Sequence, residues 1–181
     1  MTFEWNIVVT TLGGRLGFIA ALGGLRRLGE FRPSAFKGVC LGRVAEPGVF
    51  LETLLSAKQR GESWALAVGR AIPVERTFSF APPELAARLK EAVTPLAARM
   101  GSSRFHFRLE RRGLAGKVPS QSIEHEVADH IFAVAASQGV ELHASFSDPD
   151  YVLAAETVGT ECGVALLPRA MRERYPFVAT R

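Results

Sequence analysis

The sequence has few of the features that disulfide frameworks, metal sites and membrane helices require. Only two cysteines, Cys40 and Cys162, occur among 181 residues, and neither has a second ligand at metal-binding spacing. We interpret them as buried thiols of a protein in a reducing compartment. No apolar run reaches the ~18 residues of a membrane helix, and no signal-peptide pattern opens the chain. These absences predict a cytoplasmic globular protein with no membrane partner.

The usual signatures of catalysis are also missing. His125 and His130 are five residues apart, so on a helix they would point about 140° from each other and could not share an ion. Glu124 and Glu126 are two apart and face different ways, which argues against an acid-base pair. The sequence has no H-x-x-x-H, no C-x-x-C and no nucleophile elbow. We therefore expect no catalytic residue, no metal and no cofactor.

A glycine-rich turn, "TTLGGRLGF" (residues 10–18), leads from the first expected strand into a helix. Such turns can hold phosphate on backbone N–H groups. The spacing is not G-x-G-x-x-G, however, and the Lys-Ser/Thr of a P-loop is absent. The segment 14–17 also matches the short G-x-x-G of a KH loop. A tight turn is the favoured interpretation, and a small nucleotide-using enzyme is the least favoured alternative.

Positive charge is what the sequence does have. The formal net charge is +4, and eighteen of the 22 basic residues are arginine. The guanidinium group can donate two hydrogen bonds to one phosphate and can stack on bases. This composition therefore favours a polyanionic partner. Hydrophobic residues make up 48% of the chain and charged residues 22%, which are the values of a folded globular protein.

The first half alternates between strand and helix patterns. Apolar residues expected on one face of the first helix are Leu16, Ile19, Leu22, Leu25 and Leu28. The expected elements are a strand at 5–11, a helix at 15–29, two short strand pieces within 34–45, a helix at 48–61 and a strand at 64–78. This βαββαβ order predicts a ferredoxin-like domain over residues 1–78.

The second half predicts an α/β domain over residues 79–181, with the boundary near 78–82. Its expected elements are a helix within 81–101 that Pro95 should break, a strand at 105–110, a helix opened by Ser122, and strands at 151–158 and 162–168. The face of the Ser122 helix that we expect to be buried consists of Ile123, Val127, Ile131 and Val134. The fold class is therefore α+β.

A basic cluster runs from Arg104 to Lys117. On the strand, Arg104 and Arg108 share a face with His106, and Arg111, Arg112 and Lys117 follow in a glycine-containing loop. A solvated sheet face is the plain interpretation. The loop cations stand beside a helix N-terminus, however, and that combination can bind phosphate.

The C-terminal segment contains a second group of arginines. It contains three further candidate RNA-binding residues, Arg169, Arg172 and Arg174, with Tyr175 and Phe177 between or after them. Aromatic rings beside arginines are typical of surfaces that stack on unpaired bases. The pattern favours RNA binding over a solvated surface.

The second half also resembles the THUMP domain, an RNA-binding module of tRNA-modifying enzymes. The resemblance lies in "FHFRLERRGLAGKVPSQSIEHEVADHI" and "VELHASFSDPDYVLAAETVGTECGVALLP": a strand with aromatics and arginine, basic residues, a Ser-x-Glu helix start, a turn and a strand pair. "WNIVVTTLGGR" resembles the ferredoxin-like domain that precedes THUMP. The turn is Asp148-Pro149-Asp150 here, where the family typically has Asn-Pro-Asp.

The resemblance implies a standalone THUMP protein, because THUMP usually sits beside a catalytic domain and no residues remain here for one. It is similar to the adaptor that presents tRNA to the cytidine N4-acetyltransferase. We therefore expect a non-catalytic protein that binds the tRNA acceptor end and a tRNA-modifying enzyme. The residues that match the family's binding region are Arg108, Arg111, Arg112, Lys117, Ser120 and Ser122. A protein-interaction scaffold without RNA binding is the alternative.

Overall fold

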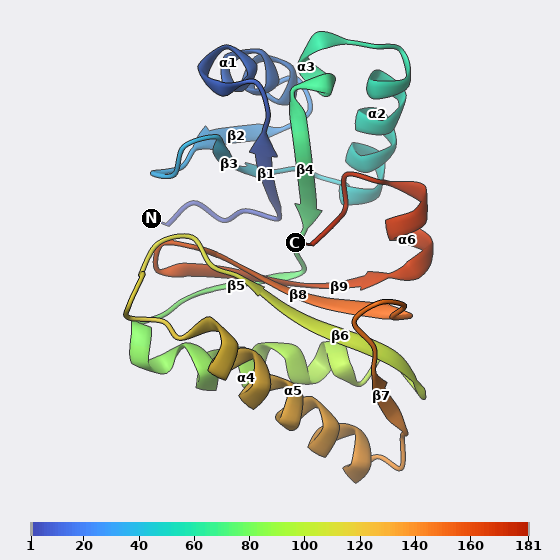
Figure 1. Cartoon of the computed structure of the whole chain (residues 1–181). Coiled ribbons are helices and arrows are strands. Elements are labelled where there is room, and N and C mark those ends of the chain that lie inside the picture. The colour runs from blue at the N-terminus through green and yellow to red at the C-terminus, as the bar shows by residue number, and fades with distance from the viewer. Residues whose placement is uncertain (1, 181) are drawn as a thin grey trace. The chain divides into compact units, whose positions relative to one another are not determined.

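The computed structural model describes residues 2–180, which form two compact units (Figure 1). The first comprises the chain through Val74 together with Arg172–Ala179, and the second contains Glu75–Met171. The chain therefore leaves the first unit after Val74 and returns to it near its end. None of the described helices is long and apolar enough to cross a bilayer.

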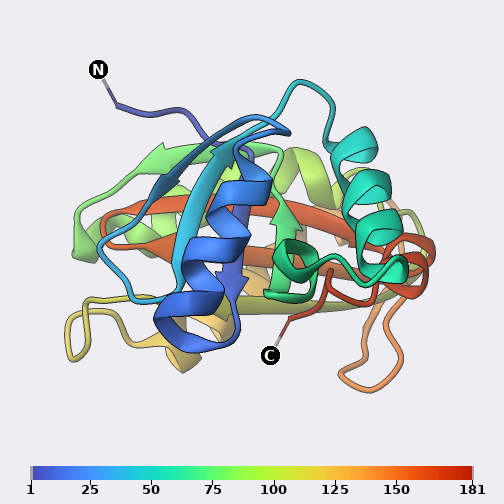
Figure 2. The ribbon, with the colours of Figure 1, turned by 90° about the horizontal axis from the view of Figure 1, so that it is seen from above.

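The first unit has the ferredoxin-like order that the sequence predicts. Its elements are β1 (Ile7–Thr11), α1 (Gly14–Leu25), β2 (Glu30–Pro33), β3 (Val39–Arg43), α2 (Pro47–Gln59), α3 (Ser63–Leu66) and β4 (Val68–Pro73). All strand pairs are antiparallel and the sheet order is β2-β3-β1-β4. Figure 2 shows the same elements from above.

The predicted buried face of α1 is wrong in its first half. Leu16 is 80% exposed and Ile19 56% exposed, whereas Leu22 and Leu25 are buried as expected. The helix turns a different side inward because it packs through its glycines. A Cβ added at Gly24 would lie 2.2 Å from the Trp64 ring, so α1 approaches α3 more closely than a side chain would permit.

Two strand predictions in this half are also wrong. The single strand expected over residues 64–78 is divided into α3, β4 and β5 (Arg76–Ser79), and β5 pairs with β9 of the second unit's sheet. The two pieces expected within 34–45 are one strand, β3, and the turn that precedes it, because β2 ends at Pro33. The turn is held by Ser34, whose Oγ lies 2.8 Å from the Val39 carbonyl.

The second unit is a five-stranded mixed sheet with two long helices. Its further elements are the 3-10 turn η1 (Pro82–Glu84), α4 (Leu85–Ala97), β6 (Ser103–Glu110), α5 (Ser120–Ser137), β7 (Leu142–Ala144), β8 (Tyr151–Val158), β9 (Glu161–Pro168) and α6 (Arg169–Arg174). The order is β5-β9-β8-β6-β7; β6 runs parallel to β7 and β8, and the other pairs are antiparallel. Figure 1 shows α4 and α5 along one face of this sheet.

The core of the second unit lies between that face and the two helices. Phe105, Phe107 and Leu109 alternate inward along β6, as the sequence predicts. Three of the four residues expected on the buried face of α5 are buried, and Ala135 takes the place of Val134.

Pro95 does not break α4, contrary to the prediction. It lies in the last turn of the helix, which continues to Ala97. A proline there removes only the N–H that would bond to the Glu91 carbonyl. The hydroxyl of Thr94, the residue before Pro95, donates to the Lys90 carbonyl at 2.7 Å. Losing one hydrogen bond near a helix end costs little free energy, and the packing of α4 against the core outweighs that cost.

Candidate nucleic-acid interface

The loop between β6 and α5 (residues 111–119, the β6–α5 loop) is tied down at both ends. The backbone N–H of Arg112 donates to the Thr157 hydroxyl at 3.0 Å, and the Gly159 N–H donates to the Arg112 carbonyl at 3.1 Å. At the far end Val118 is buried, and its N–H bonds to the Leu114 carbonyl at 3.1 Å. These contacts fix where the loop delivers the chain to α5.

The N-terminus of α5 is open. Ser122 is not its N-cap, as the sequence had suggested: the helix begins two residues earlier, at Ser120, and Pro119 occupies the cap position without a side-chain hydrogen bond. The φ fixed by a proline ring suits a helix start and explains the earlier beginning. The first backbone bond runs from the Ile123 N–H to the Pro119 carbonyl, and no acidic residue lies in the first turn. The N–H groups before Ile123 are thus left to an external acceptor.

Two cations of the loop have no carboxylate partner among the described residues: Lys117, near the start of α5, and Arg111, directly after β6. Lys117 is exposed, and its side chain makes no hydrogen bond or ion pair within residues 2–180. Arg111 is half-buried, and its Nη1 donates to the Gly113 carbonyl at 2.6 Å, which leaves its charge without a carboxylate partner among the described residues. Together with the hydroxyl groups of Ser120 and Ser122 they form a surface that we name the α5 N-terminal site.

Arg112, by contrast, points into the protein. Its Nη1 lies 2.6 Å from Oε2 of Glu156; the Arg112 side chain is 9% exposed and that of Glu156 is fully buried. A buried carboxylate needs such a partner. The positive charge of Arg112, which we expected to contact RNA, is therefore neutralised inside the protein.

Arg108 is also paired, on the strand that precedes the loop. Its Nη1 lies 3.3 Å from Oε1 of Glu124, and the same oxygen accepts the Leu109 N–H at 2.8 Å. The two side chains are 34% and 19% exposed. Glu124 therefore joins the start of α5 to the end of β6 and neutralises the arginine.

Arg104 and Arg169 lie where β6 begins and β9 ends, and both bind the Asp148-Pro149-Asp150 turn. Arg104 Nη1 is 2.6 Å from Asp148 Oδ2, and each arginine reaches Asp150 Oδ1 at 3.2 Å. Arg169 also pairs with Asp148. The hydrogen bond from the Arg104 backbone N–H, followed by the two guanidinium groups, holds the pKa of Asp150 well below its usual range. The hydrogen bond from Arg169, then that from Arg104, lowers the pKa of Asp148.

The remaining candidates, Arg172 and Arg174, lie in the part of the chain that belongs to the first unit. Arg174 pairs with Glu52 of α2, which also accepts the Tyr175 hydroxyl. Tyr175 is 8% exposed and Phe177 is 4% exposed. The interpretation of these rings as platforms for bases is therefore wrong, because they are part of the core of the first unit.

Apart from Arg172, the structure thus separates the predicted site residues into two groups. Arg111 and Lys117 lie in the β6–α5 loop, Ser120 and Ser122 lie in the first turn of α5, and neither cation has a carboxylate partner among the described residues. The charges of Arg104, Arg108, Arg112, Arg169 and Arg174 are each matched by carboxylates, which sequence reasoning missed. The Asp-Pro-Asp turn was the one signal that could have revealed two of those carboxylates, since Asp148 and Asp150 flank a rigid residue in front of a strand.

Comparison with known proteins identifies the fold. No family model and no curated protein matches the sequence. The fold is similar to that of solved structures: TrmN from Thermus thermophilus (TM-score 0.61, 17% identity, 90% of this chain and 45% of that one) and PH1313 from Pyrococcus horikoshii (0.57, 9%, 90% and 54%). A third is a 4-thiouridine synthetase in complex with RNA and ATP (0.57, 15%, 90% and 41%). The chain has a THUMP-like fold. It spans about half the length of these proteins.

Proposed function

We propose that this chain binds the acceptor end of tRNA through the α5 N-terminal site and presents it to a tRNA-modifying enzyme without doing chemistry itself. The observation that carries the proposal is the open N-terminus of α5. It combines N–H groups and a lysine, Lys117, that have no partner among the described residues with the half-buried Arg111, and the first turn contains no acidic residue. Helix N-termini bind phosphate through this combination of N–H groups and positive dipole.

The THUMP-like fold supports the choice of RNA among phosphate-bearing partners. One protein with the same fold is a 4-thiouridine synthetase in complex with RNA. The family resemblance further suggests that the partner is a modifying enzyme and that cytidine N4-acetylation is the reaction served. The site would contact phosphates, and phosphate contacts position an RNA but distinguish poorly between its bases. The shape of an RNA end would then matter more than its sequence.

The proposal that the chain is not itself an enzyme rests on the residues beside the site. Two carboxylates near the site, Glu124 and Glu156, are each paired with an arginine, so neither is free to act as a base. Turnover of a tRNA nucleoside by the purified chain, with cofactor but without a partner, would overturn this part.

A protein-interaction scaffold is the second candidate, and one observation favours it. Leu16 and Ile19 are exposed on the same side of α1, three residues apart. An apolar surface of this kind can contact another protein. It is compatible with an adaptor, which must touch both RNA and enzyme, so the two candidates differ in whether RNA is bound at all.

The experiment that separates them is recovery of bound RNA from native cells. The tagged chain is cross-linked, purified under denaturing conditions, and its RNA and cross-linked peptides are sequenced. We expect enrichment of tRNA with cross-links in residues 111–122. Recovery of protein partners without RNA would favour the scaffold, and cross-links confined to other segments would contradict the proposed site.

A further inference from the structure

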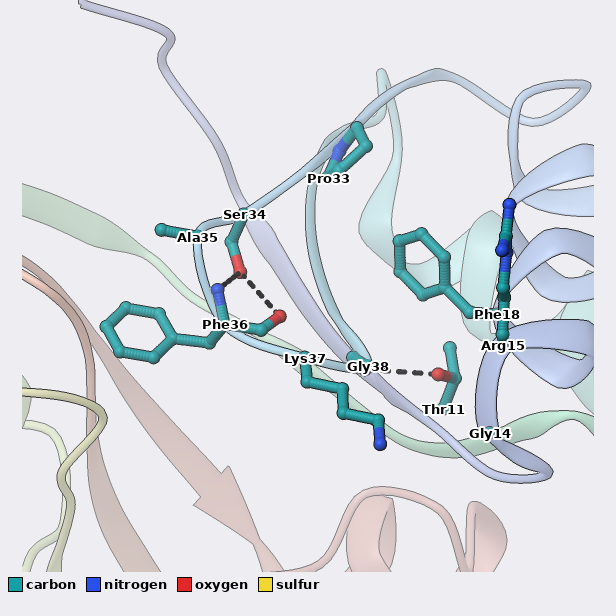
Figure 3. A pocket seen from close by; sticks show the side chains of 10 residues that line it. All are labelled: Thr11, Gly14, Arg15, Phe18, Pro33, Ser34, Ala35, Phe36, Lys37 and Gly38. Atoms are coloured by element: carbon teal, nitrogen blue, oxygen red, sulfur yellow. Dashed lines mark hydrogen bonds between the residues drawn. The ribbon is translucent and has the colours of Figure 1, made fainter.

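A cavity of about 640 Å³ opens in the first unit, in a region that the proposed function does not use. It lies between the first turn of α1 and the hairpin turn that joins β2 to β3 (Figure 3). Side chains that matter for its chemistry are Arg15 and Phe18 from the helix and Ser34 and Lys37 from the turn. Its volume is within the range of about 300–1,000 Å³ that small-molecule sites occupy.

The charge in the cavity is positive and uncompensated. Arg15 and Lys37 are exposed, neither side chain makes a hydrogen bond or ion pair within residues 2–180, and no carboxylate lines the cavity. Arg32, Arg43 and Arg60 of the same unit differ from them, because each of these three has a glutamate partner. Two cations that line one cavity, with no carboxylate in its lining, would attract an anionic ligand.

The start of α1 adds to that field. Its cap residue, Gly13, supplies no side-chain hydrogen bond, and the first turn contains no acid. Gly13 and Gly14 both have positive φ, 80° and 62°, so the backbone enters the helix in a conformation that other residues adopt with strain. From the sequence we interpreted this glycine-rich segment as a tight turn. In the structure it leaves N–H groups at the start of α1, in the cavity that the two cations also line.

An aromatic face completes the site. Phe18 lies one turn after Arg15 on α1, and its half-buried ring projects into the space between the helix and the hairpin turn (Figure 3). Figure 3 also shows the Phe36 ring directed away from Phe18, so only one ring offers a stacking surface. A phosphate alone would not use this ring, whereas a base next to a phosphate would use both the ring and the cations.

The cavity is held open by hydrogen bonds of the chain itself. The Ser34 hydroxyl bonds to the Val39 carbonyl at 2.8 Å and accepts the Phe36 N–H at 3.1 Å. The Thr11 N–H donates to the Gly38 carbonyl at 2.8 Å, which ties the hairpin turn to the end of β1. The hairpin turn is therefore ordered without a ligand, and binding would lose little conformational entropy.

We infer that this cavity binds a nucleotide, with the base stacked on Phe18 and the phosphate held by Arg15, Lys37 and the N-terminus of α1. The ligand is either a free mononucleotide or an unpaired nucleotide of an RNA strand, which share this chemistry. The inference goes beyond the proposed function, because the cavity lies in the other unit and shares no residue with the α5 N-terminal site. It involves binding only and no covalent step.

The test uses the full-length chain and calorimetric titration with cytidine monophosphate, adenosine monophosphate, inorganic phosphate and a short single-stranded RNA. We expect both mononucleotides to bind more tightly than inorganic phosphate. Arg15→Ala and Lys37→Ala should each weaken nucleotide binding about tenfold, as expected for loss of a charge-assisted hydrogen bond. Phe18→Leu, which keeps an apolar side chain, should weaken nucleotide binding several-fold and leave phosphate binding unchanged. Arg60→Ala removes a paired arginine of the same unit and serves as the matched control.

The outcomes distinguish the two ligand sources and the two sites. Tighter binding of the RNA than of the mononucleotides, with the same sensitivity to Arg15→Ala, would assign the cavity to an RNA strand, and equal or weaker RNA binding would assign it to free nucleotide. Lys117→Ala should leave mononucleotide binding unchanged, so this inference can hold even if tRNA binding at α5 fails. Inorganic phosphate that binds as tightly as the nucleotides would overturn the inference. So would nucleotide binding that Arg15→Ala and Lys37→Ala do not weaken, or no binding at all.

Discussion

The guanidinium of Arg112 lies 2.6 Å from the carboxylate of Glu156, and Glu156 is completely buried. The same arginine donates its backbone N–H to Thr157, the next residue along β8. One residue therefore fixes the start of the β6–α5 loop and neutralises a carboxylate within the protein. Its neighbour, Arg111, has no carboxylate partner among the described residues. The two adjacent arginines have different roles, one in stability and one in the proposed binding.

Arg112→Ala should destabilise the protein by about 3–5 kcal/mol, because it removes a guanidinium that neutralises the buried carboxylate of Glu156. The free energy of unfolding from urea denaturation measures this. Replacing both residues by methionine should restore much of the loss, since two apolar side chains need no partner there. A single variant as stable as the wild type would show that the ion pair does not form.

Stability should fall on acidification through the turn at Asp150. The pKa of Asp150 is lowered in the folded state, whereas in the unfolded chain it is about 3.9. The ionised carboxylate therefore contributes stability above pH ~4, and the contribution is lost as the pH falls towards the lower folded pKa. Urea midpoints between pH 7 and pH 2 should show a shallower acid limb for Asp150→Asn than for the wild type. Asp129→Asn, on the exposed side of α5, should keep the wild-type limb.

The basic cluster illustrates how far a sequence can identify a site. Alternation along β6 placed Arg104 and Arg108 correctly on the face opposite to Phe105 and Phe107. Charge counting could not reveal which arginines meet carboxylates, since Arg112 finds its partner 44 residues further along the chain. The tertiary pairing of strands decides this, and within the loop Arg111 and Lys117 are the cations that have no carboxylate partner among the described residues.

The orientation of α1 gives a stability prediction. Leu16→Ala should change the free energy of unfolding by no more than about 0.5 kcal/mol, because the side chain is 80% exposed. Leu25→Ala should cost about 2–5 kcal/mol, because Leu25 is fully buried. Urea denaturation of both variants tests the orientation, and a loss for Leu16→Ala as large as that for Leu25→Ala would mean that the whole face predicted from the sequence is buried.

Helix α1 also shows why hydrophobic periodicity predicted the wrong buried face. Every leucine and isoleucine was assigned to the buried side, which is reasonable when packing depends on large side chains. In α1 a contact with α3 is made by Gly24 against Trp64 instead. A glycine carries no hydrophobic signal, so a close helix contact of this kind is invisible to periodicity. The order of strands and helices, by contrast, depends on many residues and gave the ferredoxin-like topology correctly.

The two cysteines should resist modification in the folded protein. Burial raises the pKa of Cys40 to about 12, against a smaller opposing effect of Arg26, and burial also raises the pKa of Cys162. The reactive thiolate is therefore scarce at pH 8. Iodoacetamide should label both residues in urea and neither in buffer, as read by mass spectrometry. Rapid labelling of the native protein would show that these strands open readily.

The most direct test of tRNA binding at the α5 N-terminal site is the salt dependence of affinity for Lys117→Ala. Lys117 has no partner to disturb among the described residues, so the variant changes charge without unfolding the loop. Arg99→Ala, which removes an arginine that is paired with Glu75, is the control for a cation outside the site. Arg99 follows α4, which runs alongside α5 in the same direction, as the Lys90–Glu126 and Thr94–His130 contacts show. Arg99 is therefore roughly 20 Å along the helices from the site.

Fluorescence anisotropy with tRNA would give the dissociation constant at several salt concentrations. Lys117→Ala should weaken binding of different tRNAs alike and flatten the log–log salt slope by about 0.7, the value for one phosphate contact on a single strand. Arg99→Ala should leave the slope unchanged. An unchanged slope for Lys117→Ala together with a flatter one for Arg99→Ala would place the RNA surface elsewhere and contradict the account.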